Sequence, residues 1–161
     1  MSAPSTTSET AAPALRNGID PRGPRFTAAV TAVLLAAALV APEEVATALV
    51  AVQGLFFLAG VALGVQRTPT GLVFRAFVRP RLTPPADLED PRPPRFAQAV
   101  GLLFAAVALV GYLSGATVLG QVAVGLALVA ALLNAVIGFC LGCELYLLGL
   151  RASRRAARSA A

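Results

Sequence analysis

A seven-residue motif occurs twice in the chain, as Asp-Pro-Arg-Gly-Pro-Arg-Phe at residues 20–26 and as Asp-Pro-Arg-Pro-Pro-Arg-Phe at residues 90–96. Each copy stands directly before a block of Ala, Val and Leu. Because Asp is favoured at helix N-caps and Pro at the first helical position, both copies predict a helix start. When the sequence is shifted by 70 positions, residues 19–40 and 89–110 are identical at 12 of 22 places. This identity predicts a duplicated unit.

Apolar blocks follow each copy of the motif in pairs. The first pair covers residues 26–40 and 45–65, separated by Pro42 and two glutamates. The second pair covers residues 96–112 and a stretch from 117 to about 150, which is too long for one span and divides into a span at 118–139 and a surface helix at 141–150. Each block is close to the ~20 residues that cross roughly 30 Å of hydrocarbon. The sequence therefore predicts four membrane spans.

The composition agrees with this class of protein. Hydrophobic residues make up 57% of the chain and charged residues only 13%, whereas soluble domains carry about 25% charged residues. We expect an all-α, four-helix transmembrane bundle built from two parallel helical-hairpin repeats. The segments are predicted as a disordered cytoplasmic tail (1–18), a first two-helix membrane repeat (19–80) that ends in a surface helix at 71–79, a Pro-rich cytoplasmic linker (81–88), a second repeat (89–150) and an Arg-rich cytoplasmic tail (151–161).

The distribution of positive charge gives the orientation. All 13 basic residues are arginines, and none lies in the short turns near residues 41–46 and 112–117. By the positive-inside rule the chain is predicted to be a multi-pass protein of the cell membrane with both termini in the cytoplasm. The basic charge then reflects topology in a lipid bilayer, and no nucleic-acid partner is expected. The chain has no His, which excludes imidazole metal sites and histidine acid–base catalysis.

The arginines of the repeated motif allow two interpretations. In one, they lie at the lipid headgroups and need no further role. In the other, Arg22, Arg25, Arg92 and Arg95 converge on the repeat axis as an anion site or an interface contact, since guanidinium groups suit oxyanions.

Both thiols of the chain lie three residues apart, in Phe139-Cys140-Leu141-Gly142-Cys143. Residues i and i+3 share one face of a helix, and this is the usual spacing of a redox-active dithiol. Cys140 and Cys143 are therefore candidate catalytic residues, and the alternative is that they only pack as small apolar side chains. Two thiolates are half of a tetrahedral metal site, so a bound metal would require a dimer. Small-residue pairs such as Gly60/Gly64 are compatible with a homodimer.

Polar residues inside the spans are few. No Asp, Glu or Arg is predicted at the centre of a span, which counts against an ion-coupled transporter. Gln53 and Asn134 lie deepest, and we expect them to form hydrogen bonds between helices.

The two arginine motifs and the Phe-Cys-Leu-Gly-Cys run at 139–143 together resemble a family of small actinobacterial integral membrane proteins, catalogued as domain of unknown function 4395. The likeness covers residues 17–150 and implies no established activity, but it favours a cytosolic thioredoxin-like or sulfurtransferase partner. A looser resemblance, in helix count and Cys-x-x-Cys alone, is to four-helix membrane proteins that couple a dithiol to a quinone.

Three functions follow from these observations. The leading hypothesis is a membrane component of thiol-redox or sulfur handling that uses a cytoplasm-facing Cys140/Cys143 pair. The alternative is a non-enzymatic scaffold that docks a partner or anionic lipid through its Arg-rich face. The third is a small transporter at the repeat interface. The sequence leaves open whether the protein is an enzyme.

Overall fold

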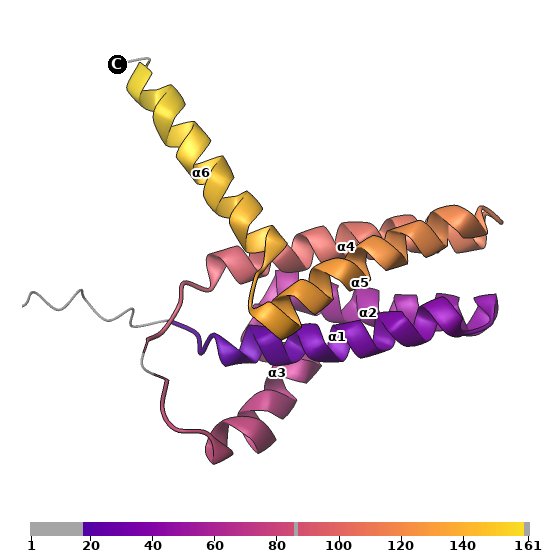
Figure 1. Cartoon of the computed structure of the whole chain (residues 1–161), viewed down its shortest axis with the longest axis horizontal. Helices are drawn as coiled ribbons and strands as arrows, with labels where there is room; N and C mark the ends of the chain where they lie inside the picture. The colour runs from indigo at the N-terminus through magenta and orange to yellow at the C-terminus, as the bar shows by residue number, and fades with distance from the viewer. Residues whose placement is uncertain (1–17, 86, 160–161) are drawn as a thin grey trace, which may run out of the picture.

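The computed structural model describes residues 18–85 and 87–159, and their regular structure is helical (Figure 1). The α-helices are α1 (Arg22–Val40), α2 (Glu43–Leu63), α3 (Pro69–Val73), α4 (Arg92–Leu113), α5 (Thr117–Ile137) and α6 (Leu141–Ser159), and short helical turns follow α2 and α3 as η1 (Val65–Arg67), η2 (Phe74–Val78) and η3 (Arg79–Arg81). The all-helical class is confirmed. The predicted tail at residues 1–18 lies almost entirely outside the described residues.

Four of these helices, α1, α2, α4 and α5, are long and apolar enough to cross a membrane. Only 22–33% of the residues in their apolar windows are buried within the chain. Large side chains such as Val40, Leu103 and Leu113 are more than 60% exposed. Such a surface is far too apolar for water and matches the hydrocarbon of a bilayer. The chain is therefore a multi-pass membrane protein.

The long helices run side by side, and each hairpin packs mainly against the other (Figure 1). The most extensive contacts join α1 to α5 and α2 to α4. At one end of the bundle Arg25 of α1 donates a hydrogen bond to the carbonyl of Val136, and Arg95 of α4 donates to the carbonyls of Val61 and Ala62. At the opposite end the hydroxyl of Thr117 donates to Glu43, 2.6 Å away, and joins the starts of α5 and α2.

Small side chains allow the helix backbones to approach closely. The buried core contains Ala38, Ala46, Ala105, Ala108 and Ala123, together with a few larger residues. At the crossing of α4 and α5, a Cβ atom added to Gly111 would lie 2.5 Å from the backbone nitrogen of Gly120. Close approach of this kind is how membrane helices gain van der Waals packing without a hydrophobic driving force between them.

Two segments leave the same end of the bundle in opposite directions (Figure 1). One is the chain from α3 to η3, where a short α-helix gives way to a π-turn and then a 3₁₀ turn. The predicted surface helix at 71–79 is therefore present but irregular, and Pro80 ends its hydrogen bonding. The other is α6, which continues to Ser159. The sequence predicts that this helix ends at residue 150. α6 extends further because the segment after residue 150 is rich in Ala and Arg, which are strong helix formers.

The two motif starts are joined by backbone hydrogen bonds. Ile19 and Glu89 form an isolated antiparallel bridge, with both N–H···O distances at 2.9 Å. The carboxylates of Asp20 and Asp90 accept hydrogen bonds from the backbone N–H groups of Arg22 and Arg92, at 3.0 and 2.9 Å. The structure places Pro21 and Pro91 at the N-caps, one residue after the aspartates that were predicted there. Each aspartate still stabilises the start of its helix, because it accepts the N–H of the first helical residue.

Candidate functional site

The cysteine pair lies at the junction of α5 and α6. Gly138 ends α5 in the left-handed conformation, with φ at 73°. Its N–H and that of Phe139 bond back to the carbonyls of Asn134 and Leu133. This is the usual way in which a glycine closes a helix. The long apolar stretch therefore divides close to where its length predicts, and α6 begins three residues later.

Cys140 is placed at the start of α6 and Cys143 in its first turn. The carbonyl of Cys140 accepts the backbone N–H of Glu144 at 3.0 Å, which is the first bond of the helix. The thiol of Cys143 donates a hydrogen bond to the Sγ of Cys140, and the two sulfur atoms are 2.6 Å apart. Both thiols are free and half-buried. The pair is thus close enough to form a disulfide, whose bond length is about 2.05 Å, with a small movement of either side chain.

The two thiols have opposite acidities. The hydrogen bond from Cys143 lowers the pKa of Cys140 from 9.0 to about 7, and the backbone N–H groups of Cys143 and Gly142 contribute further, while partial burial and Glu144 oppose them. The pKa of Cys143 is raised, first because its hydrogen is bonded to Cys140 and then because of burial and the charges of Cys140, Glu89 and Glu144. A thiol at a helix N-terminus is the usual low-pKa case. Cys140 is therefore the thiolate of the pair near neutral pH.

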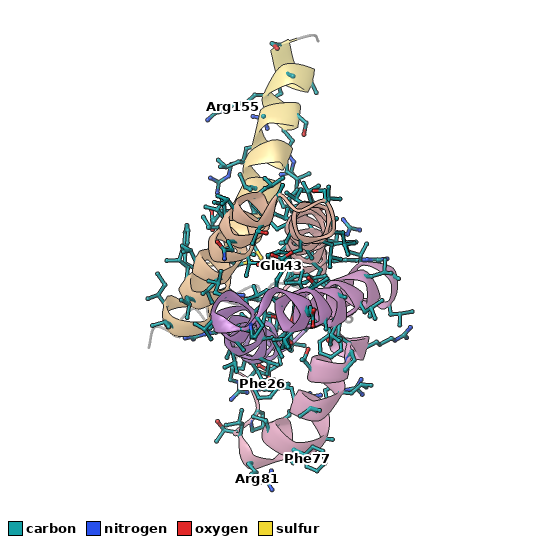
Figure 2. All side chains as sticks on the ribbon, turned by 90° about the vertical axis from the view of Figure 1, so that its right-hand side faces the viewer. Phe26, Glu43, Phe77, Arg81 and Arg155 are labelled. Atoms are coloured by element: carbon teal, nitrogen blue, oxygen red, sulfur yellow. The ribbon has the colours of Figure 1, made fainter. Side chains whose placement is uncertain are left out.

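The first turns of α6 pack against α4. A Cβ atom on Gly142 would lie 2.6 Å from the Cα of Ala97, so only glycine permits this approach. The rings of Phe96 and Tyr146 contact each other with centroids 5.7 Å apart. These contacts fix the cysteine pair to the bundle, while the rest of α6 extends away from it (Figure 2).

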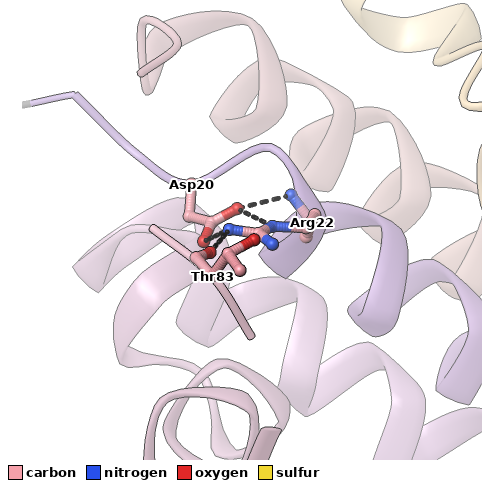
Figure 3. A network of polar contacts seen from close by, with 3 residues as sticks. All are labelled: Asp20, Arg22 and Thr83. Carbon is pink, nitrogen blue, oxygen red and sulfur yellow. Dashed lines mark hydrogen bonds and ion pairs between the residues drawn. The ribbon is translucent and has the colours of Figure 1, made fainter. Parts of the chain in front are cut away.

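The four motif arginines occupy different places. Arg22 forms an ion pair with Asp20, with Nε–Oδ1 at 3.0 Å, and donates to the carbonyl of Thr83 at 2.8 Å (Figure 3). Burial alone would raise the pKa of Asp20, but its hydrogen bonds to Arg22 outweigh burial and lower it. Arg92 uses its backbone N–H in the bond to Asp90.

Arg25 and Arg95 serve helix ends instead. Arg25 reaches the last turn of α5 at 3.2 Å, and Arg95 reaches the last turn of α2 at 2.6 and 3.1 Å. A cation at a helix C-terminus satisfies carbonyls that have no partner in the helix and interacts favourably with the dipole. Both are contacts between the two hairpins. An anion shared by the four arginines stays a prediction.

A groove of about 950 Å³ opens beside the cysteine pair. Its walls come from α1, α4, α5 and the start of α6, and Cys140, Cys143, Arg25 and Glu89 line it at the end where α6 begins. Further in, the lining is apolar except for Thr27, Thr31, Gln98 and Asn134. Pockets of 300–1,000 Å³ are typical of small-molecule sites.

Sequence reasoning missed this groove. The signal that could have indicated it is the presence of Gln98 and Asn134 within apolar blocks. Gln53, one of the two residues expected to bond between helices, does so: its amide nitrogen donates to Thr31 at 3.2 Å. Asn134 forms no such bond within residues 18–85 and 87–159, and instead lines the groove.

No group of three or more Cys, Asp or Glu side chains in the described part of the chain is arranged to hold a metal ion. A thiolate-bound metal would therefore need ligands from a second molecule.

Comparison with known families agrees with the resemblance noted in the sequence. A family model described as Domain of unknown function (DUF4395) matches residues 19–151. The chain belongs to this family. No curated protein and no solved structure matches it significantly. The DUF4395 match covers all four spans, the groove and the cysteine pair, while an actinobacterial origin stays a prediction.

Proposed function

We propose that this DUF4395 protein is a membrane component of thiol-redox or sulfur handling, in which Cys140 and Cys143 cycle between dithiol and disulfide. The observation that supports this most is the 2.6 Å separation of the two sulfur atoms at the start of α6. A pair used only for packing does not require one thiol to be stabilised as thiolate by the other.

The asymmetry of the pair suggests an order of events. The Cys140 thiolate attacks one sulfur of a partner disulfide, forms a mixed disulfide and releases the other partner sulfur as a thiolate. Cys143 then loses its proton to solvent and attacks Cys140, so that the internal disulfide forms and the second partner thiolate leaves. In this direction the protein dithiol is oxidised by two electrons and the partner disulfide is reduced. The exchange is reversible, so a partner dithiol returns two electrons to the Cys140–Cys143 disulfide by the same steps in reverse, which regenerates the dithiol when another reactant has oxidised it. A cytosolic thioredoxin-like or sulfurtransferase protein fits this role.

The test is the redox state of the pair in the purified protein in lipid nanodiscs. Glutathione buffers of increasing oxidation would be followed by alkylation and mass measurement. We expect a reversible conversion of both thiols together, and Cys140→Ser and Cys143→Ser should each abolish the internal disulfide. If the folded protein keeps two unmodified thiols in every buffer, the dithiol proposal is wrong.

We also propose that both termini, α6 and the cysteine pair lie in the cytoplasm. The support is the placement of arginine at one end of the bundle, where α3–η3 and α6 also emerge. The test is a cysteine introduced at Pro42 or Gly115, in the turns of a chain that lacks Cys140 and Cys143. An impermeant maleimide should label both positions in intact cells, and a cysteine at Thr83 or Ser153 only after lysis. The reverse labelling pattern would show that the termini and the cysteine pair lie outside the cytoplasm.

We further propose that the bundle is two parallel repeats related by an axis along the membrane normal. Several contacts support it because they occur in pairs. Ile19 bridges Glu89 at a spacing of 70 residues, and Arg25 and Arg95 each bond to the end of the other hairpin. Phe26 and Phe96 are equivalent at the 70-residue shift, and each contacts an aromatic ring of the segment that leaves the bundle: Phe74 of η2 at 5.8 Å and Tyr146 of α6 at 5.7 Å between centroids.

A scaffold function is the second candidate. The outer half of α6 carries Arg151, Arg154, Arg155 and Arg158, and it extends beyond the bundle with its side chains exposed. Anionic lipid headgroups attract such a segment. In this case replacing both cysteines by Ser leaves function intact, whereas replacing the four arginines by Gln removes it.

A further inference from the structure

We propose that the groove beside Cys140 and Cys143 binds the ring of a membrane-soluble quinone, which exchanges two electrons with the dithiol. This inference rests on the proposed redox function and names its lipid-side reactant. It is carried by three features of the groove: its depth, its two amide side chains and its position next to the sulfur atoms.

The groove runs along about half the length of α4 and α5, from the end of the bundle that carries the cysteines. Its lining residues run from Pro93 to Phe104 on α4 and from Leu126 to Ile137 on α5. At a rise of 1.5 Å per residue each stretch is about 17 Å long, which is roughly half of the 30 Å hydrocarbon layer. The inner lining is apolar, with Phe57, Gly101 and Phe104 at the deep end. A long alkyl or isoprenoid tail therefore fits along it.

Two amides contribute to the polarity of the groove. Gln98 lines it from α4, with its amide also lying against Gly60 of α2, and Asn134 lines it from α5. Neither forms a side-chain hydrogen bond to another residue of the described chain. Inside hydrocarbon an unpaired amide is costly, and membrane proteins normally give such groups a partner. A bound molecule with carbonyl oxygens would accept hydrogen bonds from both N–H₂ groups.

The position of these amides is close to the thiols. Asn134 lies one helical turn before Gly138, and its carbonyl accepts the N–H of that glycine at 3.1 Å. Cys140 follows two residues later and lines the same groove. A head group held by Asn134 thus lies next to the cysteine pair, with its tail toward the bilayer centre.

The chemistry of the dithiol selects the head group. Forming the disulfide from Cys140 and Cys143 releases two electrons and two protons. A quinone takes up both electrons and both protons on its two carbonyl oxygens and becomes a hydroquinone, so the step balances without any other reactant. An ester lipid has suitable carbonyls but accepts no electrons. A quinone alone satisfies the tail, the hydrogen bonds and the redox step.

The experiment uses the full chain, reduced and free of oxygen, in nanodiscs. The probe is a benzoquinone with every ring position substituted, which prevents thiol addition, and with a long alkyl tail. Its absorbance change reports quinone reduction, and alkylation reports the thiols. We expect one quinone to be reduced per protein. The same ring without the tail should react at least about tenfold more slowly, equivalent to about 1.4 kcal/mol of lost binding.

Matched variants separate the groove from the thiols. Ala130→Trp fills the groove, whereas Leu132→Trp adds the same ring on the lipid-facing surface, where Leu132 is 45% exposed and does not line the groove. We expect Ala130→Trp and Asn134→Leu to slow quinone reduction at least about tenfold. Leu132→Trp should leave the rate of quinone reduction unchanged. All three variants should still form the internal disulfide in glutathione buffers.

Three results would overturn the inference while leaving the dithiol function intact. The first is a dithiol that cycles with glutathione but reduces no quinone. The second is equal quinone reduction by Ala130→Trp and Leu132→Trp. The third is a groove that is found by mass spectrometry to hold only ester lipids, which added quinone does not displace. Thiols that are inert in both assays would instead refute the proposed function itself.

Discussion

At the scale of single residues, the hydrogen bond between the two thiols controls their reactivity. The Sγ of Cys140 receives the hydrogen of Cys143 and faces the N–H groups at the start of α6. A negative charge on Cys140 is stabilised there in the same way as at other helix N-termini. The two cysteines are adjacent in space but differ in acidity, and in the exchange proposed above Cys140 attacks and Cys143 resolves.

The rate of alkylation of Cys140 should therefore depend on pH with a midpoint near 7. Its pKa is lowered to about 7, so the thiolate is present above that pH and is lost by protonation as the pH falls below it. Cys143→Ala removes the main cause of the lowered pKa, and the midpoint should move upward toward 9.0. Iodoacetamide rates measured across pH for the reduced protein test this. A midpoint that Cys143→Ala leaves in place would contradict the role of the hydrogen bond.

Part of this site could be predicted from residue spacing. A spacing of three positions between the thiols predicts that the sulfur atoms lie close together, and in the structure they are 2.6 Å apart. The difference between the two thiols could not be predicted, because it depends on α6 beginning at Leu141, one residue after Cys140. Had α5 continued without the break at Gly138, neither thiol would face free N–H groups.

At the scale of helices, α6 is held to α4 by the ring contact of Phe96 with Tyr146 and by the close approach of Gly142 to Ala97. A methyl group on Gly142 would overlap the Cα and Cβ of Ala97, both at 2.6 Å, and neither can move away easily since α4 is a membrane span. We expect Gly142→Ala to displace α6 and to raise amide hydrogen exchange in residues 141–150. Gly149→Ala is the matched control, because nothing lies within 4 Å of its added Cβ, and it should strengthen the helix by about 0.5–1 kcal/mol. Equal exchange in the two variants would show that α6 is not docked through Gly142.

The ends of the spans depend on arginine. Arg95 donates two hydrogen bonds to the last turn of α2, whereas the side chain of Arg92 makes none that the structure describes. Arg95→Gln should lower the thermal midpoint in detergent by about 2–4 °C, as a loss of about 1 kcal/mol predicts for a chain of this size. Arg92→Gln removes the same charge and should change the thermal midpoint little. If both variants fall equally, net charge and not the helix contact is responsible.

The four spans were predictable as elements because about 20 apolar residues bounded by Pro, Gly or charge have few alternatives. The full length of α6 was not predicted. The predicted helix ends at residue 150, where hydropathy falls, but the Ala and Arg residues that follow also favour a helix. The irregular path from α3 to η3 was also not evident, since closely spaced prolines and glycines permit several turns.

At the scale of the whole molecule, the hairpins are interlocked through α1–α5 and α2–α4. Two separately expressed chains, residues 1–85 and 86–161, should therefore assemble in the membrane and copurify through a tag on either one. Combining Arg25→Gln with Arg95→Gln should reduce the recovered complex, because both arginine contacts between the hairpins are lost and, in the described part of the chain, only the Ile19–Glu89 bridge still joins the two motif starts. Recovery is measured by quantitative blotting, with an unrelated two-span protein as the control partner. Halves that never copurify would argue against the interlocked arrangement.

This pairing could not be predicted from the sequence. The faces of all four spans are rich in Ala, Val and Leu, and the apolar pattern around each helix does not indicate which neighbour it meets. The groove could not be predicted for the same reason, since its walls come from four helices and its lining differs little from a lipid-facing surface. In the sequence, the groove is indicated only by polar residues that stand within apolar blocks, such as Gln98 and Asn134.

The α1–α5 contact has a consequence for how the chain is made. The ribosome releases α1 early, but its principal neighbour emerges roughly 100 residues later, which at about 5–20 residues per second is on the order of 5–20 s. During that interval the first hairpin resides in the bilayer with the carbonyls that Arg95 will cover and the surface that α5 will cover both facing lipid. Biogenesis of this protein is thus completed late, and any insertion factor that shields unfinished helices would be required for α1 and α2 most of all.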